Sequence, residues 1–231
     1  MVYCLKFITA SRSLLTAIIS VLPHSTIDGL MLIVMQTHTT LRSIENSLAI
    51  YRPKKKLFRH LMKRSSVAIL IREREKIFQV LMIKRAERLG DPWSGHMAFP
   101  GGRRDRGDKN SFTTAIRETS EEVGICLPEC ARYLGRLSDQ KARSSQFNLG
   151  MLVTPFIFFM IREEQFRLNY EVASSIWIPL DFFANPKNRE VMVWTRGSFS
   201  MEVPCYKYDK YCVWGLSLSM LMELIAALPS R

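Results

Sequence analysis

The chain has 231 residues, of which 47% are hydrophobic and 23% are charged. This composition belongs to folded globular proteins with room for one sizeable core, and it excludes a disordered chain. The formal net charge of +12 at pH 7 favours polyanionic partners, but composition does not separate nucleic acid from acidic membranes or phosphorylated metabolites.

Residues 1–35 differ from the rest because they hold two short apolar runs, Leu14–Leu22 and Leu30–Met35, and a single acidic residue. Neither run approaches the ~20 residues needed to cross a bilayer, so we expect no membrane span. A signal peptide, an organelle transit peptide and a later start of translation all stay open. We treat residues 1–38 as an N-terminal extension of a cytoplasmic protein, with organelle targeting if the extension is a transit peptide.

An amphipathic helix is the first regular element that the sequence predicts. Leu41, Ile44, Leu48 and Tyr51 recur at helical spacing. Pro53 ends this helix, because proline disfavours helical geometry in the residue before it and has no amide hydrogen to donate.

A basic stretch precedes the first strand. It is interpreted either as a surface for nucleic acid or membrane, or as a solvated linker and helix face. The second interpretation is favoured because Phe58 is the only aromatic ring within the stretch, whereas surfaces that bind single strands offer several rings for stacking. The basic residues are Lys54, Lys55, Lys56, Arg59, Lys63 and Arg64.

The remaining chain alternates apolar, strand-like runs with few helices, which predicts a mixed α+β sandwich instead of a βαβ series. A helix fits Asn110–Val123, with Gly124 at its C-terminal end, and a last helix spans about Leu216–Leu228. Turns are predicted at Arg72–Lys76 and Pro100–Gly102. The predicted strands are Ser66–Ile71, Ile77–Ile83, Ala98–Phe99, Tyr133–Leu137, Leu149–Met160, Ile176–Ile178 and Val191–Trp194.

The five cysteines are odd in number and scattered. Cys126 and Cys130 form the closest pair, and nothing near them supplies the other ligands of a zinc site. Free thiols in a reducing compartment are therefore expected.

The most informative stretch is the predicted helix at Asn110–Val123. Glu118, Glu121 and Glu122 have the spacing i, i+3, i+4 and share one face of a helix. Crowded carboxylates repel one another unless a cation compensates them, and oxygen-only ligands suit Mg²⁺ or Mn²⁺. Arg117 lies four residues before Glu121 and can orient that carboxylate. A solvated acidic helix face is the alternative.

The fixed residues around these carboxylates resemble the box of the Nudix hydrolases, G-x5-E-x7-R-E-U-x-E-E-x-G-U with U apolar, over Gly102–Ile125. The resemblance implies a Nudix-type α/β/α sandwich with a mixed sheet, and hydrolysis of a nucleoside diphosphate linked to another group. This chain has Asp108 where the box has its first Glu, with one extra residue before Arg117, and Thr119 at the first apolar position. Asp108 is either a helix N-cap or an accessory catalytic residue.

The flanking segments are similar to the coenzyme A diphosphatase branch of the family, which shares the Asp start and the longer spacing. The similarity covers about residues 40–228 and implies one Nudix hydrolase domain at 39–231. The branch's upstream signature, L-L-T-x-R-[S/A]-x3-R-x3-G-x3-F-P-G-G, is partly kept. This chain has Ile83 in place of the Thr, Asp91 in place of the second Arg, and one extra residue between Ala86 and Gly95.

The resemblance also implies a set of site residues. Glu171 is a candidate general base, with a cap for the following turn as its alternative role. The residues expected to act in catalysis are Glu121, Glu122, Arg117 and Glu171. The metal ligands would be Glu118, Glu121 and Glu122, and the substrate contacts would be Lys84, Arg85, Gly101, Gly102 and Arg103.

We therefore expect a hydrolase that uses Mg²⁺ or Mn²⁺ and cleaves the diphosphate bond of a nucleoside diphosphate derivative, with coenzyme A or acyl-CoA as the favoured substrate. One alternative is a broader nucleotide diphosphatase for NADH, ADP-ribose or oxidised nucleotides. The other is a non-catalytic Nudix-fold binding module, for which the basic charge would suit nucleic acid. The expected partner is a small-molecule nucleotide, without nucleic acid or a membrane span, and a homodimer is allowed.

Overall fold

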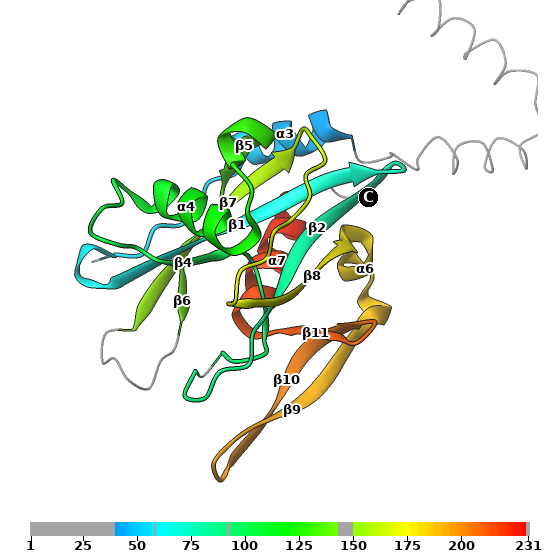
Figure 1. The fold of residues 1–231 in the computed structure, drawn as a ribbon. Helices are drawn as coiled ribbons and strands as arrows, with labels where there is room; N and C mark the ends of the chain where they lie inside the picture. Colours follow the sequence, from blue (N-terminus) through cyan, green and yellow to red (C-terminus); the bar gives the residue numbers. More distant parts are fainter. Residues whose placement is uncertain (1–39, 58, 92, 143–149, 230–231) are drawn as a thin grey trace, which may run out of the picture. The chain divides into compact units, whose positions relative to one another are not determined.

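A mixed sheet of eight strands organises the part of the chain that the computed structural model describes, which is residues 40–57, 59–91, 93–142 and 150–229 (Figure 1). Its main path runs β3-β2-β1-β7-β5, while β4 also pairs with β1, β6 with β7, and β8 with β2. The pair β1–β7 is parallel and the other pairs are antiparallel. The strands are β1 Lys63–Arg74, β2 Ile77–Arg85, β3 Met97–Ala98, β4 Gly101–Arg103, β5 Ala131–Arg136, β6 Gln140–Ala142, β7 Met151–Met160 and β8 Val172–Pro179.

The central strand β1 is covered on both faces. Residues Ser65–Ile71 are all buried, and successive side chains of a strand point to opposite sides of the sheet. Ala68 and Leu70 belong to the cluster that packs against helix α4, whereas Ile69 and Ile71 are equally buried but do not belong to it. A sheet that is apolar on both faces requires a layer of structure on each.

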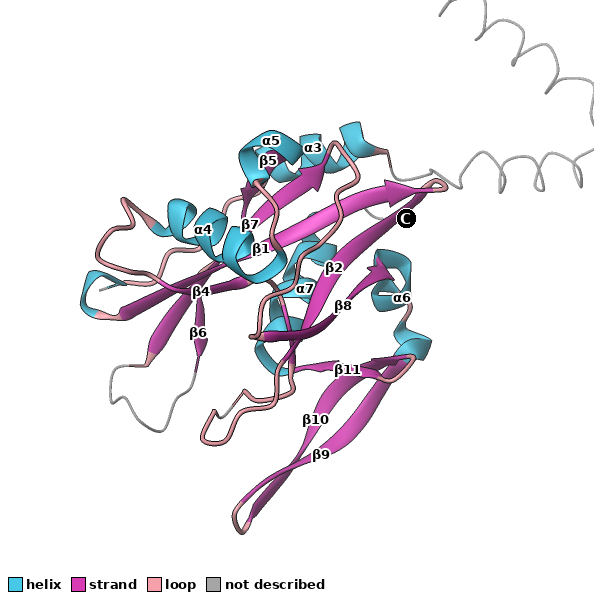
Figure 2. Ribbon diagram, in the orientation of Figure 1, coloured by secondary structure: helices cyan, strands magenta, loops and turns pink. Residues whose placement is uncertain are grey.

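Helices supply these two layers, as Figure 2 shows with α4 in front of the sheet and α7 behind it. Helix α4 packs against β1 and β4, and α7 packs against α6, β6, β10 and β11. The predicted α+β fold with a Nudix-type sandwich is thereby confirmed. The helices are α3 Leu41–Ile50, α4 Ser111–Val123, α5 Leu127–Cys130, α6 Leu180–Ala184 and α7 Gly215–Ala227, with short 3-10 turns η1 Arg59–Leu61 and η2 Pro186–Asn188.

A second sheet of three strands follows β8, in the order β11-β10-β9. Only part of its first strand was expected from the sequence. The second and third strands were not predicted, and Pro204 within the second argues against a strand because proline has no amide hydrogen for the ladder. These strands are β9 Arg189–Arg196, β10 Phe199–Tyr208 and β11 Tyr211–Trp214.

Two predicted turns are shorter than expected. The predicted turn Arg72–Lys76 was wrong at its start, because β1 continues to Arg74 and the reversal takes only Glu75 and Lys76. Both residues have positive φ, 53° and 64°, as the tight hairpin turns that match strand twist require. In the second predicted turn, Gly101 and Gly102 already belong to strand β4.

The remaining expectations have mixed outcomes. Cys126, Cys130, Cys205 and Cys212 are free thiols as predicted. Within the described ranges no helix is long and apolar enough to cross a membrane. The interpretations of residues 1–38, together with Phe58 and Leu149, fall outside the described residues.

The basic stretch is anchored to the loop after β5. Arg59 forms an ion pair with the buried Asp139 at 3.4 Å, and the backbone amide of Lys56 donates to the same carboxylate at 3.2 Å. The amide of Lys54 donates to the Ser138 hydroxyl at 2.9 Å. These contacts give at least part of the stretch a structural role.

Candidate active site on helix α4

Helix α4 is fixed at both ends by local sequence. Asn110 is its N-cap, and the Asn110 side chain accepts hydrogen bonds from the amides of Phe112 and Thr113 at 2.9 and 3.0 Å. Gly124 ends the helix at φ 74°, where a side chain would also collide with the backbone of Arg167. The predicted helix and its glycine terminus are confirmed.

The glycine pair of β4 lies directly against the acidic face of α4. Gly101 has φ 153°, and a Cβ there would lie 2.2 Å from the carbonyl oxygen of Ser66. A Cβ on Gly102 would lie 2.4 Å from the carboxylate of Glu118. The amide of Gly101 donates to Glu122 Oε2 at 2.8 Å, so it faces a carboxylate and not open space for a phosphate. Glycine is needed here because two backbones and the acidic side chains meet.

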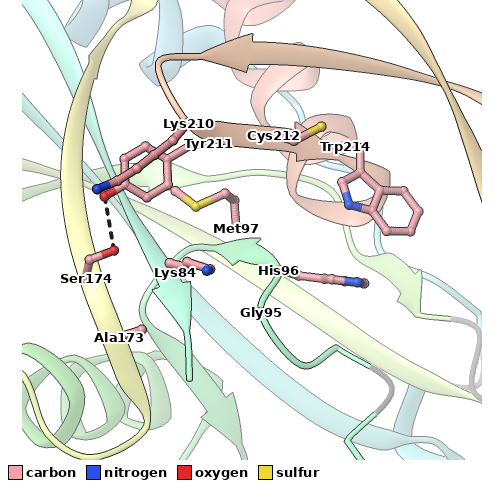
Figure 3. A pocket seen from close by; sticks show the side chains of 10 residues that line it. All are labelled: Lys84, Gly95, His96, Met97, Ala173, Ser174, Lys210, Tyr211, Cys212 and Trp214. Carbon is pink, nitrogen blue, oxygen red and sulfur yellow. Dashed lines mark hydrogen bonds between the residues drawn. The ribbon is translucent and has the colours of Figure 1, made fainter. Parts of the chain in front are cut away.

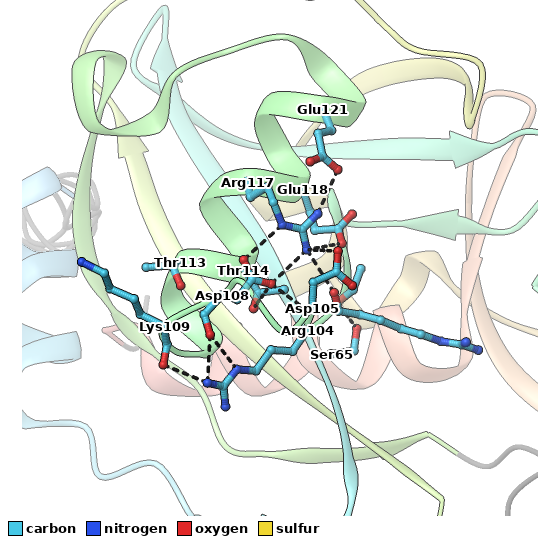
Figure 4. A network of polar contacts seen from close by, with 12 residues as sticks. Ser65, Arg104, Asp105, Asp108, Lys109, Thr113, Thr114, Arg117, Glu118 and Glu121 are labelled. Atoms are coloured by element: carbon cyan, nitrogen blue, oxygen red, sulfur yellow. Dashed lines mark hydrogen bonds and ion pairs between the residues drawn. The ribbon is translucent and has the colours of Figure 1, made fainter.

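Arg117 is the centre of the polar network shown in Figure 4. Its guanidinium donates to both oxygens of Asp108 at 3.1 and 3.0 Å, to Glu118 at 2.8 Å and to Glu121 at 2.9 Å. It also donates to the backbone carbonyl of Arg103 at 3.1 Å. The predicted pairing of Arg117 with Glu121 is confirmed, and the same guanidinium holds two further carboxylates.

Asp108 anchors this network and is not the helix N-cap, which is Asn110. Its side chain is 6% exposed and accepts hydrogen bonds from the Asp105 amide at 2.9 Å and from the Thr114 hydroxyl at 3.0 Å. The hydrogen bonds from Arg117 lower the pKa of Asp108 to about 2. The N-cap interpretation was wrong because Asp108 lies two residues too early, and Arg117 draws its carboxylate toward the middle of α4.

Glu118 and Glu122 are carboxylates in a poorly solvated place. Glu122 is only 3% exposed, and burial raises its pKa to about 7, against the opposing effects of the Gly101 amide and Arg85. Burial also raises the pKa of Glu118, although Arg117 opposes the shift. One buried and one half-buried carboxylate whose ionisation is disfavoured are suited to a cation that compensates their charge.

Glu121 has different surroundings from its two neighbours. Its side chain is 53% exposed, and its carboxylate is held by Arg117. Among the described residues, no group of three or more His, Cys, Asp or Glu side chains is gathered as a metal site would require. The oxygen chemistry of Glu118 and Glu122 fits Mg²⁺ or Mn²⁺, and whether Glu121 joins them stays a prediction.

Glu171 lies beside this acidic face, just before β8. Its charge helps to raise the pKa of Glu122, and its carboxylate forms an ion pair with Arg88 at 3.7 Å. The side chain that caps the local turn is Asn169, which accepts from the Glu171 amide at 2.8 Å. Strand β8 begins directly after Glu171, so its alternative role as a cap for a following turn was wrong.

The predicted basic contacts lie in two places. Lys84 and Arg85 end strand β2, and Arg103 ends β4. Arg85 forms an ion pair with Asp91 at 2.9 Å. Asp91 is the residue that stands in place of the second Arg of the upstream signature. This chain therefore lacks the second Arg of the signature, and the Asp91 in its place neutralises Arg85, an expected phosphate contact.

The fold and the acidic helix define a recognised protein family. Residues 62–195, more than half of the chain, match the NUDIX domain. The chain belongs to the Nudix family.

Curated relatives agree with this assignment. An uncharacterized protein of Schizosaccharomyces pombe is 46% identical over 105 residues, covering 44% of this chain and 32% of the relative. The peroxisomal coenzyme A diphosphatase NUDT7 of Mus musculus is 30% identical over 140 residues, covering 57% of each. The uncharacterized Nudix hydrolase NudL of Pectobacterium atrosepticum is 32% identical over 140 residues, covering 60% of this chain and 69% of the relative. This chain thus spans about a third of the first relative and just over half of the second.

Solved structures of lower identity are similar as well. A MutT/nudix family protein from Enterococcus faecalis has 16% identity and a TM-score of 0.46, covering 83% of this chain and 69% of that one. The Ap4A hydrolase of C. elegans has 17% identity and a TM-score of 0.41, covering 52% and 82%. At these TM-scores the likenesses add nothing to the family assignment.

Proposed function

We propose that this chain hydrolyses the diphosphate bond of a nucleoside diphosphate derivative, with coenzyme A or acyl-CoA as substrate and Mg²⁺ or Mn²⁺ as cofactor. The proposal rests on the buried carboxylate of Glu122 and the half-buried one of Glu118 against the Gly101–Gly102 strand, in a chain of the Nudix family. The substrate is supported by the relative named as a coenzyme A diphosphatase.

The proposed cation would be held by Glu118 and Glu122, with Glu121 as a third ligand. When bound, it neutralises charge on the phosphate oxygens and lowers the pKa of an attacking water. Arg117 orients Glu118 and Glu121, and the Gly101 amide orients Glu122. The polypeptide thus fixes where each carboxylate oxygen lies before substrate arrives.

Glu171 is proposed to act as the general base that accepts a proton from the attacking water. Its side chain is 32% exposed, so solvent reaches it, and its charge acts on Glu122. Arg88 would hold its carboxylate in place. Lys84, Arg85 and Arg103 remain proposed phosphate contacts, although the ion pair with Asp91 weakens Arg85 as one.

A product assay on the full chain tests this proposal. Coenzyme A, acetyl-CoA, NADH, ADP-ribose and an oxidised nucleotide are supplied in turn with Mg²⁺ or Mn²⁺. Coenzyme A should give 4'-phosphopantetheine and adenosine 3',5'-bisphosphate, at the highest kcat/KM of the series. A higher kcat/KM for NADH or ADP-ribose would identify that compound as the preferred substrate instead of coenzyme A. If no compound gave metal-dependent product release, the proposed hydrolase activity would be wrong.

The same preparation tests the partners that we propose. A hydrolase for small nucleotides should release product without shifting DNA or RNA in a gel at moderate salt. A salt-dependent shift with no metal-dependent hydrolysis would instead indicate the binding module, since counterion release weakens nucleic-acid binding as salt rises. Light scattering gives the mass in solution and tests the homodimer.

We further propose that residues 39–231 form the hydrolase domain and that residues 1–38 are an extension, in a cytoplasmic protein or one targeted to an organelle. The NUDIX match at 62–195 and the compact unit Arg42–Pro229 support this boundary. Fluorescent fusions of the full chain and of residues 39–231 test the targeting. Different locations of the two fusions would support a transit peptide, and the same diffuse distribution would favour the cytoplasm.

A further inference from the structure

A pocket of about 550 Å³ lies between the main sheet and the second sheet (Figure 3). Its floor comes from the ends of β2 and β3 and from β8, and its other wall comes from the turn between β10 and β11 and from β11 itself. We call it the β11 pocket. The residues lining it are Lys84, Gly95, His96, Met97, Ala173, Ser174, Lys210, Tyr211, Cys212 and Trp214.

The charge of the β11 pocket is positive. Lys84 and Lys210 enter it from opposite walls, and the described residues that line it include no Asp or Glu. Lys84 forms an ion pair with Glu87 at 3.6 Å, and solvent screens this pair because the Glu87 side chain is 80% exposed. Lys210 lies over the ring of Tyr211, 5.6 Å from its centroid. The pocket therefore favours an anion.

Flat rings and hydroxyl groups form the rest of the walls. The Tyr211 hydroxyl is 3.1 Å from the hydroxyl of Ser174, which fixes the ring against β8. The rings of His96 and Trp214 meet edge to face, with centroids 4.8 Å apart. Aromatic surfaces beside polar groups suit a planar heterocycle, and the volume is in the range of small-molecule sites.

The β11 pocket lies beside the strand ends next to Arg85 and Glu171. Lys84, which lines it, precedes Arg85, and the Arg85 amide donates to the carbonyl of His96 at 3.0 Å. Ala173, which also lines the pocket, is two residues after Glu171, and the Ala86 amide donates to the carbonyl of Glu171 at 2.8 Å. The pocket and the proposed general base therefore share the adjoining ends of β2 and β8, so a single substrate can reach from one to the other.

We propose that the β11 pocket binds the nucleoside end of the substrate, with Lys84 and Lys210 contacting a phosphate monoester that is separate from the diphosphate to be cleaved. This inference rests on the proposed function and extends it, because it selects substrates whose ribose carries an additional phosphate. Coenzyme A has this group at its 3' position and 3'-dephospho-coenzyme A does not. The neutral pantetheine arm offers no charge for the two ammonium groups.

The test compares these two substrates on the full chain and on Lys210→Gln, with Lys187→Gln as the matched control on an exposed 3-10 turn. Losing one charge-assisted contact should raise KM for coenzyme A about tenfold with little change in kcat. The same substitution should change KM for 3'-dephospho-coenzyme A by less than about twofold. Lys187→Gln should match the wild-type protein on both substrates.

Binding of adenosine 3',5'-bisphosphate and of 5'-AMP, measured by calorimetry without metal, gives a second readout. The wild-type protein should bind the bisphosphate more tightly than 5'-AMP. Lys210→Gln should lower the ratio of the two affinities about tenfold. Equal effects of Lys210→Gln on both substrates and both nucleotides would overturn the pocket assignment while hydrolysis stands. Absence of hydrolysis by the wild-type chain would instead overturn the proposed function, and the calorimetry would still decide the role of the pocket.

Discussion

The acidic helix α4 and the β11 pocket are built in contrasting ways. The network around Arg117 comes from Arg103–Glu121, and its hydrogen bonds join residues of this one segment. The β11 pocket is assembled from four segments, near Lys84, His96, Ser174 and Lys210. In the first region one guanidinium binds three carboxylates of the protein, whereas in the second Lys84 has one exposed partner, Glu87, and Lys210 lies over the ring of Tyr211. We infer that the first region holds a fixed geometry and the second awaits a ligand.

The largest expected loss of folding stability follows substitution of Gly101, where the backbones of β1 and β4 and the acidic side chains of α4 are closely packed. Gly101→Ala places a methyl group 2.2 Å from the Ser66 carbonyl oxygen at φ 153°. We expect the free energy of unfolding to fall by about 4 kcal/mol, as for a severe backbone clash. Gly107→Ala, where nothing lies within 4 Å, should change it by less than about 0.5 kcal/mol. Similar denaturation midpoints for the two variants would contradict this packing.

Arg117→Lys tests whether the acidic region depends on the geometry of the guanidinium, because lysine keeps the positive charge but not the planar set of five N–H donors. A lysine is a point charge and cannot hold Asp108, Glu118 and Glu121 together, so we expect about 3 kcal/mol of lost stability. Arg132→Lys is the control, because Arg132 forms a single exposed ion pair with Glu45. Chemical denaturation measures both. A loss at Arg117 no larger than at Arg132 would show that the network is not cooperative.

Glu171 tests whether the acidic region reaches beyond α4. If Glu171 is the general base, Glu171→Gln should lower kcat about a hundredfold and leave KM nearly unchanged. Glu73→Gln, on an exposed end of β1, should keep the wild-type kcat. A loss of less than about threefold would leave Glu171 only as the partner of Arg88.

The smallest expected effect is on the pH dependence of the free energy of unfolding, through Asp108. The folded pKa of Asp108, about 2, lies below its usual value of 3.8, so the carboxylate stabilises the folded state at every pH above that value. This stability, about 2 kcal/mol, is lost as the pH falls through the folded pKa. The difference in unfolding free energy between wild type and Asp108→Asn should therefore shrink from pH 5 toward pH 2. A constant difference over that range would contradict the ion pair with Arg117.

The same contrast explains what the sequence could predict. Helix α4, its glycine terminus and the pairing of Arg117 with Glu121 follow from spacings of a few residues, and all three are confirmed. The role of Asp108 was missed because helical spacing relates neighbours on the helix and not a loop carboxylate that folds back onto it.

The β11 pocket could not be predicted in the same way. Lys210 lies at the turn between β10 and β11, neither of which was predicted, and it lines the same pocket as Lys84 only after the two sheets have packed. His96 and Trp214 both lie within residues 40–228, the range that resembles the coenzyme A diphosphatase branch, but nothing in the sequence showed that their rings meet. Contacts between distant segments depend on tertiary packing, which local patterns do not contain.

The most direct test of the central claim is Mg²⁺-dependent cleavage of coenzyme A by the wild-type chain and by Glu122→Gln, measured by separating the two products. The amide keeps the size of Glu122 and an oxygen acceptor for the Gly101 amide, so the fold should persist. We predict that kcat falls about a thousandfold while Glu75→Gln, in the exposed hairpin turn, retains wild-type activity. Near-normal turnover by a folded Glu122→Gln protein would contradict the account.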